Sequence, residues 1–138
     1  EALAVAKINV EKHQLTQRIQ LIESDGLKGL QQKFDCIICN PPYVCEASMQ
    51  ALPEEYKAEP LLALAGGSDG MDFIRQLLQE LPERMNDKAI LVLEIGNERE
   101  HFESAFPRLE AIWLETSAGE DQVLLLTKEA IEKASPLS

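Results

Sequence analysis

The sequence has few basic residues and no long apolar run. It holds 13 lysines and arginines against 24 aspartates and glutamates, which gives a formal net charge of −11 over 138 residues. Proteins that bind nucleic acid usually present a basic face, so this balance argues against direct DNA binding. No apolar run approaches the roughly 20 residues that span a bilayer, and the first residues lack the layout of a signal peptide. We therefore expect a cytoplasmic protein with no membrane partner.

Cysteine is also scarce, with three residues in all, Cys36, Cys39 and Cys45. An odd number argues against a disulfide framework. The spacing of Cys36 and Cys39 imitates a metal-binding C-x-x-C motif, but residues three apart in a strand point to opposite faces. We therefore expect buried, reduced thiols and no metal site.

Hydrophobic residues make up 45% of the chain, enough for one core. The length is too short for two ordinary domains, so we expect a single domain over residues 1–138. Helical spacing of apolar residues predicts helices over 1–14, 74–85 and 97–106. The second should follow an N-cap at Ser68 or Asp69 and be interrupted at Pro82, because proline cannot continue a helix.

Apolar runs predict the strands of an α/β sheet, over residues 18–26, 34–39, 88–96, 111–115 and 121–127. The run 34–39 is typical of a strand buried on both faces of a parallel sheet. A short turn separates the last two strands, which predicts an antiparallel hairpin at the sheet edge. Together the elements indicate a doubly wound, mostly parallel sheet, whose ligands bind outside the carboxyl ends of its strands.

One such carboxyl end carries the sequence Asn40-Pro41-Pro42-Tyr43. A residue before proline is pushed to extended geometry, and each proline fixes φ near about −65°. The segment should therefore hold the Asn40 amide and the nearby carbonyls in one orientation, with no proline N–H to compete for acceptors. Such a rigid bracket suits a planar amino group, and Tyr43 can stack on it. The plain structural alternative is a turn that ends the strand.

This segment resembles the active-site motif of S-adenosylmethionine-dependent methyltransferases that modify planar amino groups. Residues 52–73, LPEEYKAEPLLALAGGSDGMDF, are similar to the pattern of HemK-type protein-glutamine methyltransferases. EYKAEP, LEIGN, and WLE followed by GEDQVLLLTKE most resemble the branch that methylates a glutamine in the third protein of the large ribosomal subunit. The branch that acts on release factors is a near relative. The resemblance covers essentially the whole chain and implies a Rossmann-like class I methyltransferase fold.

The resemblance also implies roles for individual residues. Asn40 and Pro41 accept hydrogen bonds from the glutamine amide, Pro42 keeps the bracket rigid, and Tyr43 packs against the substrate. Asn40, Pro41 and Tyr43 are thus the expected catalytic residues, and all four bind substrate. The reaction is an in-line displacement at the methyl group of the cofactor S-adenosylmethionine, and it uses no metal.

Asp25 matches an acidic residue that lies near the adenine of the cofactor in this family, so Asp25 and Asn40 are the expected cofactor-binding residues. Gly26 follows where relatives often carry an aromatic residue, and an ordinary Asp-Gly turn explains Asp25 equally well.

Four other polar residues have weaker functional signals. Glu59 is expected to shape the substrate loop together with the adjacent Pro60. Glu94, at the end of a buried strand, is expected to be structural or to lie near the site. His13 and His101 are expected on helix surfaces.

The sequence departs from the family at its start. The first two family strands, their glycine-rich cofactor loop and the preceding helical domain have no counterpart, and no G-x-G occurs. We therefore expect the C-terminal part of a catalytic domain, inactive by itself, with weak cofactor binding. Strand 34–39 would then expose an edge and apolar faces, which favours self-association.

Two other functions remain open for this sequence. One is a noncatalytic interaction module that keeps the methyltransferase fold. The other is a nucleic-acid amino methyltransferase, which the acidic balance opposes.

Overall fold

The computed structural model describes residues 2–45, 66–117 and 119–136. The chain forms two compact units, Glu1–Leu30 and Gln31–Ser138. The single domain expected over 1–138 stays a prediction. None of the described helices has the length and apolar character needed to cross a lipid bilayer.

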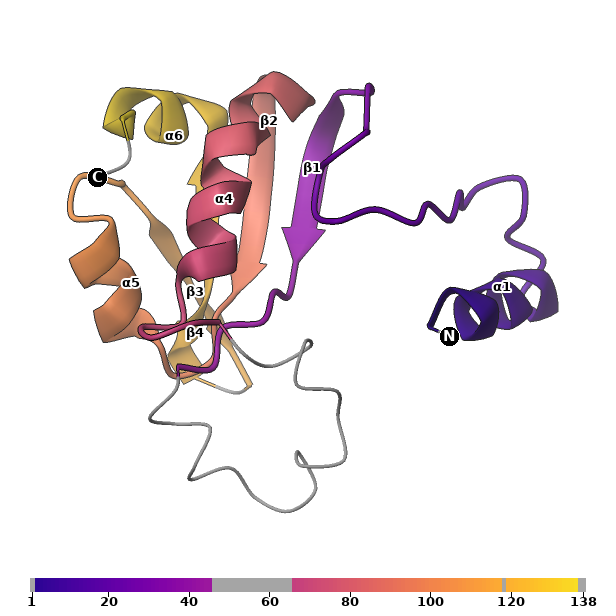
Figure 1. The fold of residues 1–138 in the computed structure, drawn as a ribbon, viewed down its shortest axis with the longest axis horizontal. Helices are drawn as coiled ribbons and strands as arrows, with labels where there is room; N and C mark the ends of the chain where they lie inside the picture. The colour runs from indigo at the N-terminus through magenta and orange to yellow at the C-terminus, as the bar shows by residue number, and fades with distance from the viewer. Residues whose placement is uncertain (1, 46–65, 118, 137–138) are drawn as a thin grey trace. The chain divides into compact units, whose positions relative to one another are not determined.

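The first unit consists of helix α1 (Ala2–Lys12) followed by turns (Figure 1). The predicted helix forms, but none of its residues is buried. The strand predicted over 18–26 does not form, and its Ile19 and Leu21 side chains are 43% and 39% exposed. A strand needs a neighbour for its backbone N–H and C=O groups, and within the described residues this segment pairs with none. That prediction was therefore wrong.

The second unit alternates strands and helices. Its elements are β1 (Phe34–Cys39), α4 (Asp72–Glu80), the 3-10 helix η2 (Leu81–Arg84), β2 (Met85–Glu94), α5 (Arg99–Ala105), β3 (Ile112–Thr116), β4 (Gly119–Thr127) and α6 (Lys128–Ala134). The strands form one sheet in the order β1-β2-β4-β3 (Figure 1). β1 and β2 are parallel, and the other two pairs are antiparallel. This mixed α/β sheet, with the β3–β4 hairpin at its edge, confirms the predicted α/β fold class. The described part of the sheet is not mostly parallel, however, because two of its three strand pairs are antiparallel.

The boundaries of α4 differ from the prediction at one end. Its N-cap is Met71, not Ser68 or Asp69, and no side chain caps the first turn. Pro82 interrupts the helix as predicted, because α4 ends at Glu80 and the proline lies in the first turn of η2.

Helix α6 was not predicted from the sequence. It begins after Thr127, whose hydroxyl oxygen accepts a hydrogen bond from the Ala130 N–H at 3.1 Å. Threonine is a preferred N-cap residue, so Thr127 could have indicated from the sequence that a helix begins here.

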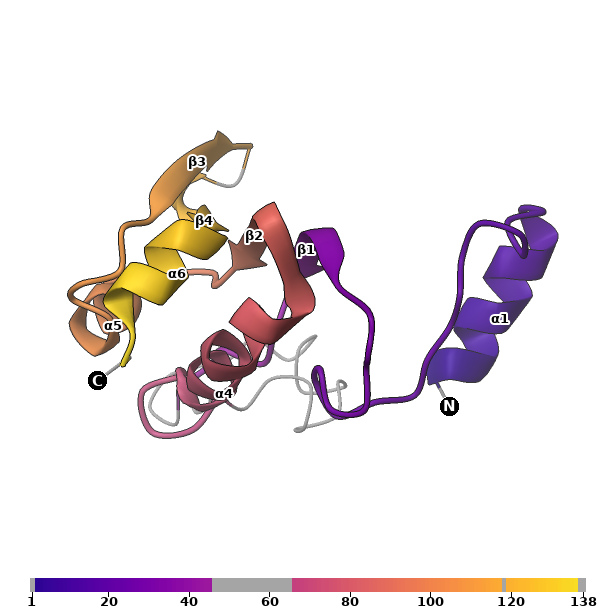
Figure 2. The same cartoon turned by 90° about the horizontal axis from the view of Figure 1, so that it is seen from above.

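Helices α4 and α6 lie on the same face of the sheet (Figure 2). Helix α6 contacts β2, β4 and η2. Because side chains alternate between the faces of a strand, every second residue of β2 and β4 points toward these helices. The fully or nearly fully buried core includes Ile74, Leu77, Leu78, Leu91, Leu93, Leu124, Leu126 and Ile131.

The opposite face of the sheet carries apolar side chains across all four strands. Ile38 pairs with Val92, Val92 with Leu125, and Leu125 with Ile112. Paired residues share a face, so these four form a continuous line that we call the apolar row. Val92 and Leu125 are half-buried, whereas Ile38 is 80% and Ile112 56% exposed. This face therefore leaves apolar surface in water.

Strand β1 is not buried on both faces, contrary to the prediction. It pairs with β2 on one side, and no strand of the described residues pairs with its other edge. Cys36 points to the same face of the sheet as the exposed Ile38 and is itself exposed, Cys39 is half-buried and Cys45 is buried, so the expected burial was wrong for Cys36. Burial raises the pKa of the Cys39 thiol to about 11, which keeps this thiol protonated at neutral pH.

Candidate active site

Asn40 lies at the carboxyl end of β1, at the sheet edge where α/β proteins usually bind ligands. Because β1 and β2 are parallel and Cys39 pairs with Leu93, Asn40 and Glu94 lie at the same edge. Glu94 is half-buried and pairs with Val123, whereas Asn40 is exposed. Asn40 is therefore accessible to a ligand at this edge.

The backbone after Asn40 is anchored in the protein. Pro41 is buried and Pro42 is half-buried, and their rings fix φ. Beyond them, the Val44 carbonyl oxygen accepts a hydrogen bond from the Gly66 N–H at 2.9 Å. The segment is thus held by β1 at one end and by residues 66–70, here called the glycine loop, at the other.

Tyr43 is held in place by two glycines that approach it closely. A Cβ atom on Gly70, which has φ of +79°, would lie 2.1 Å from the Tyr43 carbonyl oxygen. A Cβ atom on Gly96, with φ of +54°, would lie 2.6 Å from Cε2 of the Tyr43 ring. Only glycine fits both the space and the left-handed backbone. The sequence analysis missed Gly96, although a glycine directly after a buried strand was a usable signal.

The glycine loop is held in shape by the Asp69 carboxylate. One carboxylate oxygen accepts hydrogen bonds from the Met71 N–H and the Arg75 Nη1, both at 3.0 Å, and the other contacts Nη2 of Arg75. The Asp72 N–H also donates to the Gly66 carbonyl at 3.0 Å. The hydrogen bonds from the Arg75 guanidinium lower the pKa of Asp69 from 3.8 to about 2. Asp69 therefore braces the loop instead of capping α4.

Asp25 belongs to the first unit. Its carboxylate is 70% exposed and forms an ion pair with Lys28 at 2.5 Å, and Gly26 has φ of +58°. The Asp-Gly turn that was the alternative explanation for Asp25 is therefore present. Its role as a cofactor ligand stays a prediction.

The remaining residues that the sequence analysis singled out lie in different parts of the chain. Glu59 and Pro60 lie outside the described residues. His13 is exposed in the first unit, after α1. His101 is on α5, where its side chain is 48% exposed and bonded to Glu98.

The groups around Asn40 can hold a planar hydrogen-bond donor. The Asn40 amide oxygen and the neighbouring backbone carbonyls are acceptors, and the two prolines have no N–H. The ring of Tyr43, three residues further along the chain, lies against Gly96. An amide or an exocyclic amine meets these requirements equally well, so the geometry by itself does not distinguish the two.

Comparison with known proteins gives the class of protein first. The sequence model of the family described as "Methyltransferase small domain" matches residues 1–56, which include Asn40 and Tyr43. The chain is therefore related to methyltransferases.

The particular relatives are curated as ribosomal protein uL3 glutamine methyltransferases. The protein from Bordetella pertussis is 50% identical over 132 residues, which cover 95% of this chain and 44% of the relative. The protein from Neisseria gonorrhoeae is 49% identical over 131 residues, which again cover 95% of this chain and 44% of the relative. The protein from Francisella tularensis is 40% identical over 96% of this chain and 43% of its own length. These matches confirm the resemblance drawn from the sequence, and the chain spans less than half the length of these relatives.

Replacing Gly70 with alanine is expected to lower the free energy of unfolding by about 3 kcal/mol or more. The added Cβ would meet the Tyr43 carbonyl, a backbone atom that cannot rotate away. The matched control is Gly119→Ala, where φ is +142° and the nearest atom is the flexible Asp121 carboxylate at 3.2 Å. That change should cost only about 1–2 kcal/mol of backbone strain. Urea unfolding measures both, and equal losses would contradict the proposed contact.

Replacing Asp69 with asparagine is expected to destabilise the protein at pH 7 and much less at pH 2. The folded-state pKa of Asp69 lies below its ordinary value of 3.8, so its stabilisation is present above about pH 4 and is lost as the pH falls toward 2. The difference in urea midpoint between the variant and the unmodified chain should therefore shrink over this interval. Asp121→Asn, at an exposed aspartate, is the control. A difference that stays constant from pH 7 to pH 2 would rule out the explanation.

Proposed function

We propose that the whole protein carrying this sequence methylates the side-chain amide nitrogen of a glutamine in ribosomal protein uL3, using S-adenosylmethionine. The observation that carries the proposal is the exposed Asn40 on an anchored backbone at the carboxyl edge of β1. The relatives, curated as uL3 glutamine methyltransferases, support the choice of acceptor. A ribosomal protein substrate also places the reaction in the cytoplasm.

In this proposal the chain orients the amide and does not deprotonate it with a strong base. The amide N–H groups donate to the Asn40 side-chain oxygen and to the Pro41 carbonyl, and the Tyr43 ring packs against the glutamine side chain. The nitrogen lone pair of an amide is delocalised into its carbonyl, so the nitrogen is a poor nucleophile. Holding both N–H groups on fixed acceptors aims the lone pair at the methyl group and opposes that delocalisation.

The residues fit only part of the cofactor site. Asn40 offers an exposed donor and acceptor at the ligand-binding edge, whereas the Asp25 carboxylate would have to exchange its ion pair with Lys28. The bound cofactor supplies an electrophilic methyl group on a positively charged sulfur. With the cofactor bound, Asn40 and Pro41 would hold the amide nitrogen toward this methyl group. The methyl carbon would pass from sulfur to nitrogen, with the electron pair of the broken bond left on sulfur and one N–H proton lost to water. No metal takes part.

Each alternative function meets a specific objection. A nucleic-acid amino methyltransferase would have to bind phosphates with a chain whose net charge is −11. A noncatalytic module would not require an exposed asparagine on an anchored proline pair. A release factor remains the competing acceptor, because its methylation uses the same amide chemistry.

The variant Asn40→Ala is expected to lower kcat in the whole protein by a factor on the order of 100 or more, with little change in stability. The exposed amide contributes little to packing, but it would hold the substrate amide in the transition state. Transfer of a radiolabelled methyl group to uL3 measures kcat, and thermal unfolding measures stability. The 138-residue chain alone, assayed in parallel, is expected to be inactive.

The matched control is Asn86→Ala, since Asn86 is also exposed but lies at the start of β2, where it bonds to Asp35 at 2.7 Å. It should retain full activity. Parallel assays with a release factor and with DNA test the acceptor. Unchanged turnover in Asn40→Ala, or faster transfer to DNA than to uL3, would refute the proposed function.

We also propose that copies of this chain associate through the apolar row and the open edge of β1. A second copy can offer the same two features: a strand edge that pairs with no other strand of the described residues, and exposed isoleucines. The net charge of −11 opposes the approach of two copies, so association should strengthen as salt screens this repulsion.

Sedimentation velocity of the chain at low and high salt tests this association. Ile38→Lys should shift the chain toward monomer, because it places a charge in the apolar row. Ile8→Lys is the matched control, since Ile8 is 63% exposed on α1 and outside the row. A monomer under all conditions, or equal effects of the two variants, would contradict the proposal.

A further inference from the structure

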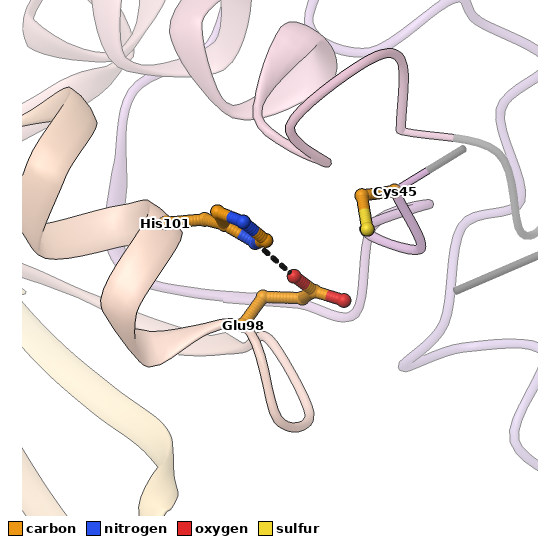
Figure 3. Close-up of side chains that lie close together, drawn as sticks. All are labelled: Cys45, Glu98 and His101. Carbon is orange, nitrogen blue, oxygen red and sulfur yellow. Dashed lines mark hydrogen bonds and ion pairs between the residues drawn. The ribbon is translucent and has the colours of Figure 1, made fainter. Parts of the chain in front are cut away.

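Three potential metal ligands from distant parts of the sequence meet beside the glycine loop (Figure 3). They are Cys45, Glu98 and His101, which we call the Cys45 cluster. One ligand atom from each residue lies within 4.8 Å of the other two. Figure 3 shows the Cys45 sulfur facing the Glu98 carboxylate, which in turn faces the His101 ring.

Glu98 is the one buried charged residue in the part of the chain that the structure describes, with 7% of its surface exposed. It occupies the N-cap position of α5, yet its side chain makes no capping hydrogen bond there. Its carboxylate instead bonds to Nδ1 of His101 at 2.5 Å. A buried carboxylate is costly unless its charge is compensated, and a metal ion held between Glu98, His101 and Cys45 would compensate it.

The backbone holds the cluster from two sides. Cys45 is 3% exposed and follows Val44, whose carbonyl bonds to the glycine loop. The Glu98 N–H donates to the Ile95 carbonyl at 3.2 Å, directly after β2. His101 lies one turn further along, in α5. The three ligands are therefore carried by rigid elements, which is what a preorganised site requires.

We propose that the Cys45 cluster binds a zinc ion. Thiolate, imidazole and carboxylate are all zinc ligands, whereas magnesium and calcium prefer sites made only of oxygen atoms. A thiolate and a carboxylate carry two negative charges and the imidazole is neutral, so a divalent ion balances the site. The expectation of no metal was based on Cys36 and Cys39, and neither belongs to this cluster.

The geometry allows zinc with a small adjustment. Zinc–ligand bonds of about 2.0–2.3 Å in a tetrahedron place the ligand atoms roughly 3.5 Å apart. The hydrogen bond of 2.5 Å between the Glu98 carboxylate and His101 Nδ1 must therefore open by about 1 Å, while the most widely separated ligand atoms, which lie within 4.8 Å of one another, must move closer. Three protein ligands leave the fourth position to water. The half-exposed side chain of His101 provides the route by which the ion enters.

Binding should release protons. Zinc takes the thiolate form of Cys45, so the thiol proton leaves, and any proton shared between Glu98 and His101 must leave as well. Affinity should therefore rise with pH. The bound ion would join the segment that carries Asn40 to α5. This inference does not depend on the proposed methyl transfer.

Titration of the chain with Co²⁺, a spectroscopic substitute for zinc, tests the site. We expect one equivalent to bind with a sulfur-to-cobalt charge-transfer band in the near ultraviolet, and one equivalent of Zn²⁺ to displace it. Cys45→Ser should abolish the band. Glu98→Gln and His101→Gln should each weaken binding by at least about tenfold. Circular dichroism confirms that each variant is folded, and Glu98→Gln keeps an acceptor for His101.

Cys36→Ser and Cys39→Ser are the matched controls, because both thiols lie on β1 outside the cluster. They should leave the band unchanged. Absence of a band in the unmodified chain would overturn the proposal. A band that survives Cys45→Ser, or that Cys36→Ser removes equally well, would overturn it too.

Discussion

The close approach of the glycine loop to the segment after β1 is the constraint on which the site depends. Gly70 has no side chain, so its backbone can lie against the Tyr43 carbonyl, and the Gly66 N–H reaches the Val44 carbonyl. Two irregular segments thereby support each other without a regular strand pair. Tyr43 and Val44, which make these contacts, lie between the exposed Asn40 and the buried Cys45 in the chain.

The sheet determines where these irregular segments can lie. The parallel pair β1 and β2 brings two carboxyl ends to one edge, so the residues after Cys39 and after Glu94 leave the sheet together. The antiparallel β4 covers the second edge of β2, and helices cover one face. The other face retains the apolar row. The same sheet therefore presents a polar edge suited to a small planar group and an apolar face suited to another protein surface.

Two carboxylates near the site differ because their surroundings differ. Asp69 is a third exposed and bonded to Arg75, so water screens the pair and its main effect is to hold the loop in shape. Glu98 is buried, and its carboxylate bonds to the His101 ring. A surface ion pair can be replaced at small cost, whereas a buried carboxylate demands compensation. Asp69 therefore has a structural role in the glycine loop, whereas Glu98 is a candidate metal ligand.

The local sequence determined the strands of the second unit, the interruption at Pro82 and the rigid bracket at Pro41 and Pro42. These features depend on residues close together in the chain, through side-chain alternation, fixed proline φ and turn chemistry. The same local information indicated Asn40 as a site residue, because it follows an apolar strand directly.

Only the tertiary structure decided which residues are buried and which distant residues meet. Residues 18–26 have the alternation of a strand but form none, because pairing requires a neighbour that local sequence does not supply. Cys36 does lie in a paired strand, but it is exposed because it shares the uncovered face of the sheet with Ile38. Gly96 meets Tyr43, and Cys45 meets Glu98 and His101, across more than fifty residues of chain. Such contacts depend on how the sheet and its loops pack in space, which periodicity along the sequence does not encode.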